Sequence, residues 1–117
     1  MGQYLILLRD EHMVAPVSPR PQAVREQLLQ DMMAWTASIA AEERLVAVQR
    51  LTKDGRVLRG REAPITIDGP YSETKEAIGG FVLIEAPSWH EAERIAAACP
   101  GLAQGFALEV RAVVAEE

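Results

Sequence analysis

The chain has 117 residues, of which 49% are hydrophobic and 25% charged, so we expect one domain with a single core over residues 1–117. Its net charge of −5 argues against nucleic acid and anionic membranes as direct partners, because both attract basic surfaces. The single cysteine, Cys99, excludes an intrachain disulfide, and the apolar run from Tyr4 to Leu8 is far shorter than the roughly 20 residues that span a bilayer. These features predict a cytoplasmic protein without a membrane segment.

The chain opens with an apolar run, residues 3–9, that ends in charged residues and predicts a buried strand. Asp10, Glu11 and His12 follow directly. His12 beside two carboxylates can serve in proton transfer or join a metal site. Adjacent residues rarely converge on one ion, however, and no second histidine follows at ligand spacing. A solvated strand end is therefore favoured, and neither a metal nor a cofactor is expected.

A long helix is predicted after a proline-containing linker. Ser18 is a suitable N-cap, and Pro19 fits the first helical position, where its missing amide costs nothing. Arg25 falls on the side of this helix that should face solvent. Apolar side chains recur every three or four residues and form one stripe that should pack on a sheet: Val24, Leu28, Met32, Trp35 and Ile39. The charged residues 42–44 end the helix.

Residues 45–51 predict the next strand, and Asp54-Gly55 after it is a strong hairpin signal. Val57-Leu58 would form the returning arm of this hairpin. Three arginines surround that arm and can hold an anionic substrate by forked hydrogen bonds: Arg56, Arg59 and Arg61. Arginines on an edge hairpin also prevent edge pairing, and this second interpretation is favoured.

The stretch from Ile65 to Glu85 reads as a short strand, a polar loop and a longer apolar strand. Asp68 and Gly69 favour a tight turn, and Pro70 stiffens the exit from it. The pair Gly79-Gly80 would allow either a sharp turn into the strand or the close approach of another group. The loop can be a solvated connection, or its charged side chains can line a pocket, where a carboxylate binds a ligand or moves a proton.

The remaining elements complete the fold. Ser88 and Glu91 form a capping box for a second helix, whose small-residue face includes Cys99 as a buried, inert thiol. Residues 106–113 alternate as a strand. The order predicts a ferredoxin-like βαββαβ α+β sandwich with an inserted hairpin. Two helices cover one face of such a sheet, so the other face, with Arg50, Glu109 and Arg111, predicts a homodimer.

The residues Asp68-Gly69-Pro70-Tyr71-Ser72-Glu73-Thr74-Lys75-Glu76 resemble the signature of the YCII-related family, in the branch named for its Asp-Gly-Pro-Phe motif. Tyr71 stands in place of Phe, and the similarity extends over 78–81 and 109–111. The resemblance implies dimeric α/β-barrel-like assemblies with a cleft near each motif loop. Some family members resemble dehydrochlorinases proposed to use a His–Asp pair. Its Asp can be carried over to Asp68, whereas no histidine clearly matches and His12 is the only nearby candidate.

Three functions are consistent with these features. The first is small-molecule binding or acid–base catalysis in a dimer-edge cleft, with Asp68 and His12 as the catalytic candidates. The residues expected to contact a ligand there are Gly69, Pro70, Tyr71, Glu73, Lys75 and Arg111. The alternative is a non-catalytic regulatory or interaction module, because relatives of this branch resemble domains found beside sigma factors. The third is a structural dimer whose loop only caps the sheet.

Overall fold

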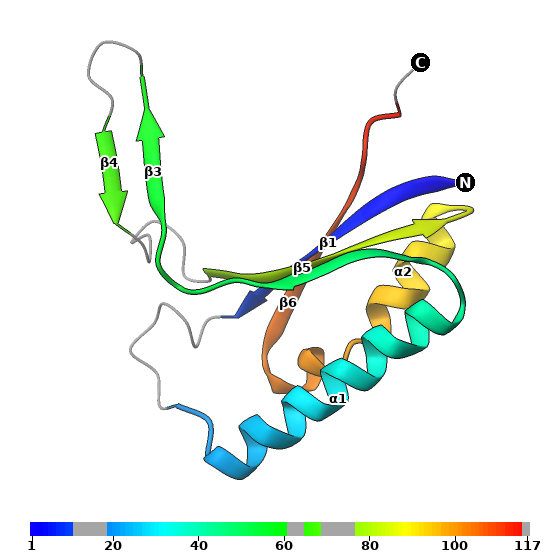
Figure 1. The fold of residues 1–117 in the computed structure, drawn as a ribbon, viewed down its shortest axis with the longest axis horizontal. Helices are drawn as coiled ribbons and strands as arrows, with labels where there is room; N and C mark the ends of the chain where they lie inside the picture. Colours follow the sequence, from blue (N-terminus) through cyan, green and yellow to red (C-terminus); the bar gives the residue numbers. More distant parts are fainter. Residues whose placement is uncertain (11–18, 61–64, 69–76, 116–117) are drawn as a thin grey trace.

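The computed structural model describes residues 1–10, 19–60, 65–68 and 77–115 (Figure 1). Its strands are β1 (Gly2–Asp10), β2 (Leu45–Arg50), β3 (Arg56–Arg59), β4 (Ile65–Asp68), β5 (Ala77–Ala86) and β6 (Phe106–Ala112). Its helices are α1 (Gln22–Ala41) and α2 (Trp89–Ala97), and the 3-10 helix η2 (Pro100–Gln104) follows α2.

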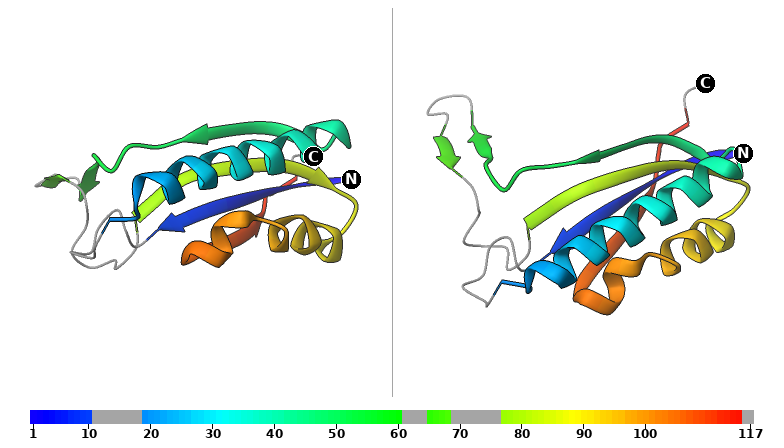
Figure 2. Two further views of the ribbon diagram at one scale, coloured as in Figure 1. Left: turned by 90° about the horizontal axis from the view of Figure 1, so that it is seen from below. Right: turned by 60° about the horizontal axis from the view of Figure 1, so that its bottom comes forward.

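The strands form two sheets. Four of them make an antiparallel sheet in the order β2–β5–β1–β6, and β3 and β4 pair with each other in a separate two-stranded sheet. Both long helices lie on the same face of the four-stranded sheet (Figure 2). The protein is therefore α+β, and its strand order and one-sided helices are compatible with the predicted ferredoxin-like sandwich.

The core lies between this sheet and the two helices. Side chains of β1 alternate between buried and half-buried, and Ile6 is fully inaccessible to solvent. The predicted stripe of α1 is confirmed, because Trp35 and Ile39 are buried and Met32 packs partly against them. Trp35 Nε1 also donates a hydrogen bond to the carbonyl oxygen of Ile95 at 3.0 Å. This bond satisfies the buried indole and joins α1 to α2.

The second helix begins as predicted, whereas Cys99 lies beyond its last residue, Ala97. The amide of Glu91 donates a hydrogen bond to Ser88 Oγ at 3.2 Å, as expected for an N-cap serine. Ala92 and Ala96 are buried on the face that meets the sheet, and these small side chains allow the helix to lie close to it. Pro100 begins η2, which takes the chain to β6.

Neither helix of the described residues covers the other face of the four-stranded sheet (Figure 2). Arg9 and Arg111 each approach a carboxylate oxygen of Glu109, at 3.6 and 3.4 Å. The half-buried apolar residues of this outer face are Leu5, Leu7, Phe81 and Leu83. The predicted homodimer would use this face.

The hairpin predicted at Asp54-Gly55 is wrong, because β2 pairs with β5 and β3 pairs with β4. The ten-residue strand β5 offers β2 a longer ladder than the two-residue arm Val57-Leu58 could provide. Gly60 follows β3 with a φ of 74°, a left-handed conformation that glycine adopts without strain. The chain therefore reverses after β3 and not before it.

Helix α1 starts at Gln22, with Pro21 as its N-cap residue, and not at the predicted Ser18-Pro19. Ser18 lies outside the described residues. The ring of Pro21 disfavours helical backbone in the residue before it, which is Arg20. Residues 19–21 are accordingly not helical, and Arg20 lies just before α1.

The glycine pair Gly79-Gly80 does not form a sharp turn. It lies inside β5, where Gly80 allows the neighbouring strand β2 to come close. Both glycines lie inside β5, and β1 shifts register so that Leu8 pairs with Gly80 and Arg9 with Ile78. Gly79 is therefore an extra residue in the ladder, as in a β-bulge. A Cβ atom at Gly80 would lie 2.8 Å from the carbonyl oxygen of Gln49 on β2, so only glycine fits.

Candidate small-molecule site

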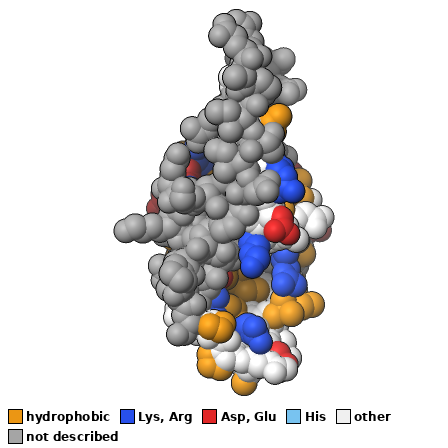
Figure 3. Space-filling view, turned by 90° about the vertical axis from the view of Figure 1, so that its left-hand side faces the viewer, with side chains coloured by type: hydrophobic (Ala, Val, Ile, Leu, Met, Phe, Trp, Pro, Cys, Tyr) orange, Lys and Arg blue, Asp and Glu red, His pale blue; other side chains and the backbone are white. Residues whose placement is uncertain are grey.

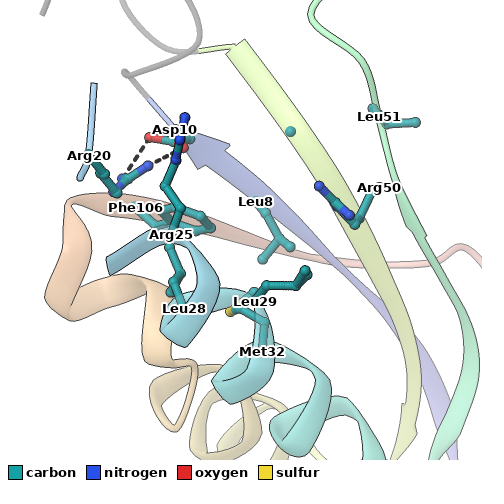
Figure 4. Close-up of a pocket in the computed structure, with 11 residues that line it drawn as sticks. Leu8, Asp10, Arg20, Arg25, Leu28, Leu29, Met32, Arg50, Leu51 and Phe106 are labelled. Atoms are coloured by element: carbon teal, nitrogen blue, oxygen red, sulfur yellow. Dashed lines mark hydrogen bonds and ion pairs between the residues drawn. The ribbon is translucent and has the colours of Figure 1, made fainter. Parts of the chain in front are cut away.

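A cleft of about 360 Å³ opens where β1 ends and β5 begins, between the first half of α1 and the helix-facing side of the sheet. At this end of the molecule, basic side chains surround a group of hydrophobic ones (Figure 3). The apolar walls include Leu8, Leu28, Leu29, Met32 and Phe106 (Figure 4). The charged groups that line the cleft are Asp10, Arg20, Arg25 and Arg50.

The cleft exists because the two helices differ in length. Helix α1 has 20 residues and is about 30 Å long, whereas α2 has 9 residues and is about 14 Å long. The apolar stripe of α1 is less buried in its first half: Trp35 and Ile39 are buried, whereas Val24 and Leu28 are only half-buried. The first half of α1 therefore lies over sheet surface that α2 does not reach.

A bidentate ion pair joins Asp10 and Arg20 in the lining of the cleft. Asp10 ends β1 and is only 8% exposed. Arg20 Nη1 and Nη2 donate to its two carboxylate oxygens at 2.9 and 3.0 Å. Arg20 Nη2 also donates to the carbonyl oxygen of Gln104 at 2.6 Å, and the guanidinium lies 5.3 Å from the centre of the Phe106 ring.

This geometry gives the Asp10–Arg20 pair a structural role. A bidentate ion pair occupies both carboxylate oxygens, so Asp10 is a poor candidate for carrying a proton. The pair ties the segment before α1 to the end of β1, and through Gln104 to η2. It thereby builds one wall of the cleft.

Two further arginines line the cleft from opposite elements. Arg25 extends from α1 toward the end of β1, and Arg50 extends from β2 over β5 (Figure 4). Within the part of the chain that the structure describes, neither guanidinium takes part in an ion pair or a hydrogen bond. Both are exposed. They are the groups in the described cleft that remain able to bind an anion.

The predicted position of Arg50 was wrong. Arg50 was expected on the outer face of the sheet, but it lies opposite Gly80 on the helix side. A register shift between Leu45 and Ala47 inverts the alternation of β2, because one extra residue exchanges the two faces. Arg25 is exposed, as expected, and it also lies at the rim of the cleft.

Cys99 lies near the cleft but does not line it. Its thiol is 3.6 Å from the sulfur of Met32, which does line the cleft. Cys99 is buried, and this burial raises the pKa of its thiol, although backbone hydrogen bonds from Gly101 and Leu102 partly offset the effect. The interpretation of Cys99 as a buried thiol is confirmed, and the raised pKa disfavours the reactive thiolate.

Most of the predicted site residues lie outside the described ranges. These are His12, Gly69, Pro70, Tyr71, Glu73 and Lys75. Asp68 is the last residue of β4, and its backbone pairs with Arg56. Arg111 lies on β6 opposite Leu5, on the outer face of the sheet and away from the cleft, with its side chain 69% exposed.

The segment that directly follows the motif lies at the cleft. The described chain resumes at Ala77, whose backbone pairs with Asp10. Two residues later, Gly79 lines the cleft and accepts a hydrogen bond from the Leu51 amide at 2.9 Å. The segment that follows the motif therefore forms one edge of the cleft.

A second cleft, of about 460 Å³, lies between α1 and η2. Its described lining contains one carboxylate, Asp31, and no cationic side chain. Gln27 Nε2 already donates a hydrogen bond to Asp31 Oδ1 at 2.8 Å. This second cleft thus has fewer groups that could orient a ligand than the cleft at the end of the sheet.

Two other kinds of site were searched for in the described ranges. No group of three or more His, Cys, Asp or Glu side chains there is arranged to hold a metal ion. Neither helix among those residues combines the length and the apolarity needed to cross a membrane.

The fold is α+β, with a ligand-sized cleft at one end of the four-stranded sheet. The sequence specifies the family: the sequence model of the YCII-related domain matches residues 3–116, so the chain belongs to the YCII-related family. The family inferred from the motif is thereby confirmed. No curated protein matches the chain.

Proposed function

We propose that this YCII-related protein binds a small molecule in the cleft between α1 and the sheet. The observation that carries the proposal is a mostly apolar cavity with a few charged groups at its rim, which is the usual composition of a ligand site. Its volume of about 360 Å³ falls within the range of about 300–1,000 Å³ found for such sites.

We also propose that the motif region borders this cleft, as in the branch of the family with the Asp-Gly-Pro-Phe motif. In support, the described chain leaves β4 at Asp68 and resumes at Ala77 opposite Asp10, at the rim of the cleft. Asp68 is then the candidate general acid or base, with His12 as the second candidate. Proposed ligand contacts from the same region are Gly69, Pro70, Tyr71, Glu73 and Lys75.

The functional unit in this proposal is a homodimer. The support is the outer face of the sheet, where apolar side chains such as Leu7 and Phe81 have no helix over them. Arg111 lies on that face, so it would contribute to the dimer interface or to a cleft edge formed by the partner. Sedimentation at micromolar concentration should give a dimer, and a monomer alone would overturn this part.

The binding proposal is tested by thermal unfolding with a broad panel of small molecules, because a ligand that binds only the folded state raises the melting temperature. Leu29→Trp fills the cleft from α1 without disturbing the buried core, since Leu29 is 40% exposed. Met33→Trp is the matched control, one turn along the same helix and 62% exposed outside the cleft.

We expect Leu29→Trp to abolish the stabilisation by each hit and Met33→Trp to retain it. The proposal fails if the panel gives no stabilising compound, or if both variants keep the same response. If the protein chemically converts any of the stabilising compounds, that activity can be used to test the proposed acid–base role of Asp68. Asp68→Asn should remove that activity in a protein that still folds, and retained activity would exclude Asp68 as the proton carrier.

A further inference from the structure

The charges around the cleft differ from those of the whole chain. The protein carries a net charge of −5, yet the described lining of the cleft contains three arginines and one aspartate. Charges of one sign gathered around a low-dielectric wall concentrate the electric field and attract the opposite sign. The described lining of the cleft is therefore positive on a protein that is negative overall.

Only part of this positive charge is neutralised within the protein. Both Nη atoms of Arg20 are engaged, because they donate to the two oxygens of Asp10 and to the Gln104 carbonyl, and its Nε is buried. Arg25 and Arg50 have no ion-pair or hydrogen-bond partner in the described part of the chain. A guanidinium offers a planar set of donors that matches carboxylate and phosphate oxygens.

The space between these two arginines is apolar. Leu8 and Gly79 belong to the sheet side of the cleft, whereas Leu28 and Met32 belong to α1. A bare inorganic anion would leave these apolar surfaces in contact with water. A molecule with an apolar body would cover them and gain stabilisation in proportion to the apolar area that it buries.

We propose that the ligand of the cleft is a small organic anion, a carboxylate or phosphate group on an apolar body, whose charged group is bound by Arg25 and Arg50. This inference rests on the proposed function and specifies the class of ligand. Asp10 and Arg20 act as positioning residues, because their ion pair holds the wall of the cleft and commits both Nη atoms of Arg20.

The experiment measures binding by titration calorimetry for three probes that share one chain and differ in charge: octanoate, octanamide and octylamine. A second set, 3-phenylpropionate and its amide, replaces the straight chain by an aromatic body. Inorganic phosphate supplies the anion without an apolar body. We expect the carboxylates to bind at least about tenfold more tightly than the amides, and octylamine and inorganic phosphate to bind least.

Two variants test the residues. Arg25→Gln and Arg50→Gln remove the charge but keep a side-chain stem that covers the apolar wall, so a loss of binding reports charge and not packing. Each should weaken carboxylate binding about tenfold and leave amide binding nearly unchanged. Arg94→Gln is the matched control, because Arg94 lies on α2 and pairs with Glu91 and Glu42 outside the cleft.

The outcomes separate the two proposals. Amides that bind as tightly as the carboxylates, and lose binding in Leu29→Trp, overturn the anionic class and leave the small-molecule site standing. Carboxylate binding that is unchanged in both glutamine variants also overturns it, and shows that the two arginines only cover apolar surface. If no probe binds and the broad panel gives no hit, the site itself is wrong.

Discussion

The two ends of the helix-covered sheet face differ in how completely they are filled. At one end, α1 and α2 lie side by side, Trp35 bonds to Ile95, and Ile84 is fully buried beneath them. At the other end, α2 does not reach the sheet, Leu29 is 40% exposed, and a cleft of about 360 Å³ remains between α1 and the sheet. We refer to these as the closed end and the open end.

The difference shows that α1 contributes both to the hydrophobic core and to the cleft. The same apolar stripe of α1 continues through both ends, so its sequence does not distinguish core from cleft. The two ends differ in whether α2 lies beside α1, because this nine-residue helix reaches only the closed end. Stability should therefore depend on the closed end, and ligand binding on the open end.

The largest effect is expected at the closed end. Ile84→Ala removes a side chain with 0% exposure, so it should lower the free energy of unfolding by about 2–5 kcal/mol through lost burial and a residual cavity. Urea denaturation measures this change. A loss below about 1 kcal/mol would mean that the closed end is not the stabilising part of the molecule.

The second-largest loss of stability is expected when the Asp10–Arg20 ion pair at the open end is broken. Asp10→Ala leaves the guanidinium of Arg20 buried without its carboxylate, which should cost about 3 kcal/mol in urea denaturation. Replacing both residues together, as Asp10→Leu with Arg20→Met, should restore most of that loss, because no uncompensated charge remains. A double variant as unstable as the single one would contradict this account of the pair.

A smaller loss is expected at Gly80, where β5 leaves no room for a side chain beside β2. Gly80→Ala places a Cβ atom 2.8 Å from the Gln49 carbonyl oxygen, so the strands must separate slightly. We expect a loss of about 1–3 kcal/mol in the free energy of unfolding, as for other overpacked sites. Unchanged stability would show that the ladder at the bulge adapts freely.

The smallest effect is expected on the cleft wall. Leu29→Ala removes a side chain that is already 40% exposed, so stability should change by no more than about 0.5 kcal/mol. Binding of octanoate should nevertheless weaken, because the ligand loses an apolar contact. If this variant instead destabilises the protein as much as Ile84→Ala, the open end belongs to the core and is not a binding cleft.

The closed end could be predicted from the sequence because its signals are local. The spacing of Trp35 and Ile39 reports the buried face of α1 directly, and Ser88 with Glu91 marks the start of α2. The YCII-related family was likewise predicted from consecutive motif residues and confirmed by the match over residues 3–116. These features depend on neighbours within a few positions.

The open end could not be predicted in the same way. The Asp10–Arg20 pair joins residues ten positions apart, and no periodicity links them. Arg50 changed faces because of one extra residue in β2, which cannot be recognised before the pairing with β5 is known. The cleft itself results from the difference in reach between α1 and α2, which is a property of the assembled fold.

The central claim is that the open end of the sheet binds a small organic anion. Backbone amide chemical-shift mapping with octanoate tests it most directly, because every non-proline residue reports separately. We predict that the shifts concentrate at Leu8, Leu28, Met32, Arg50 and Gly79, and saturate together as octanoate is added. Shifts confined to Leu5 and Leu83 on the outer face, or to Pro100-adjacent residues of η2, would contradict the claim.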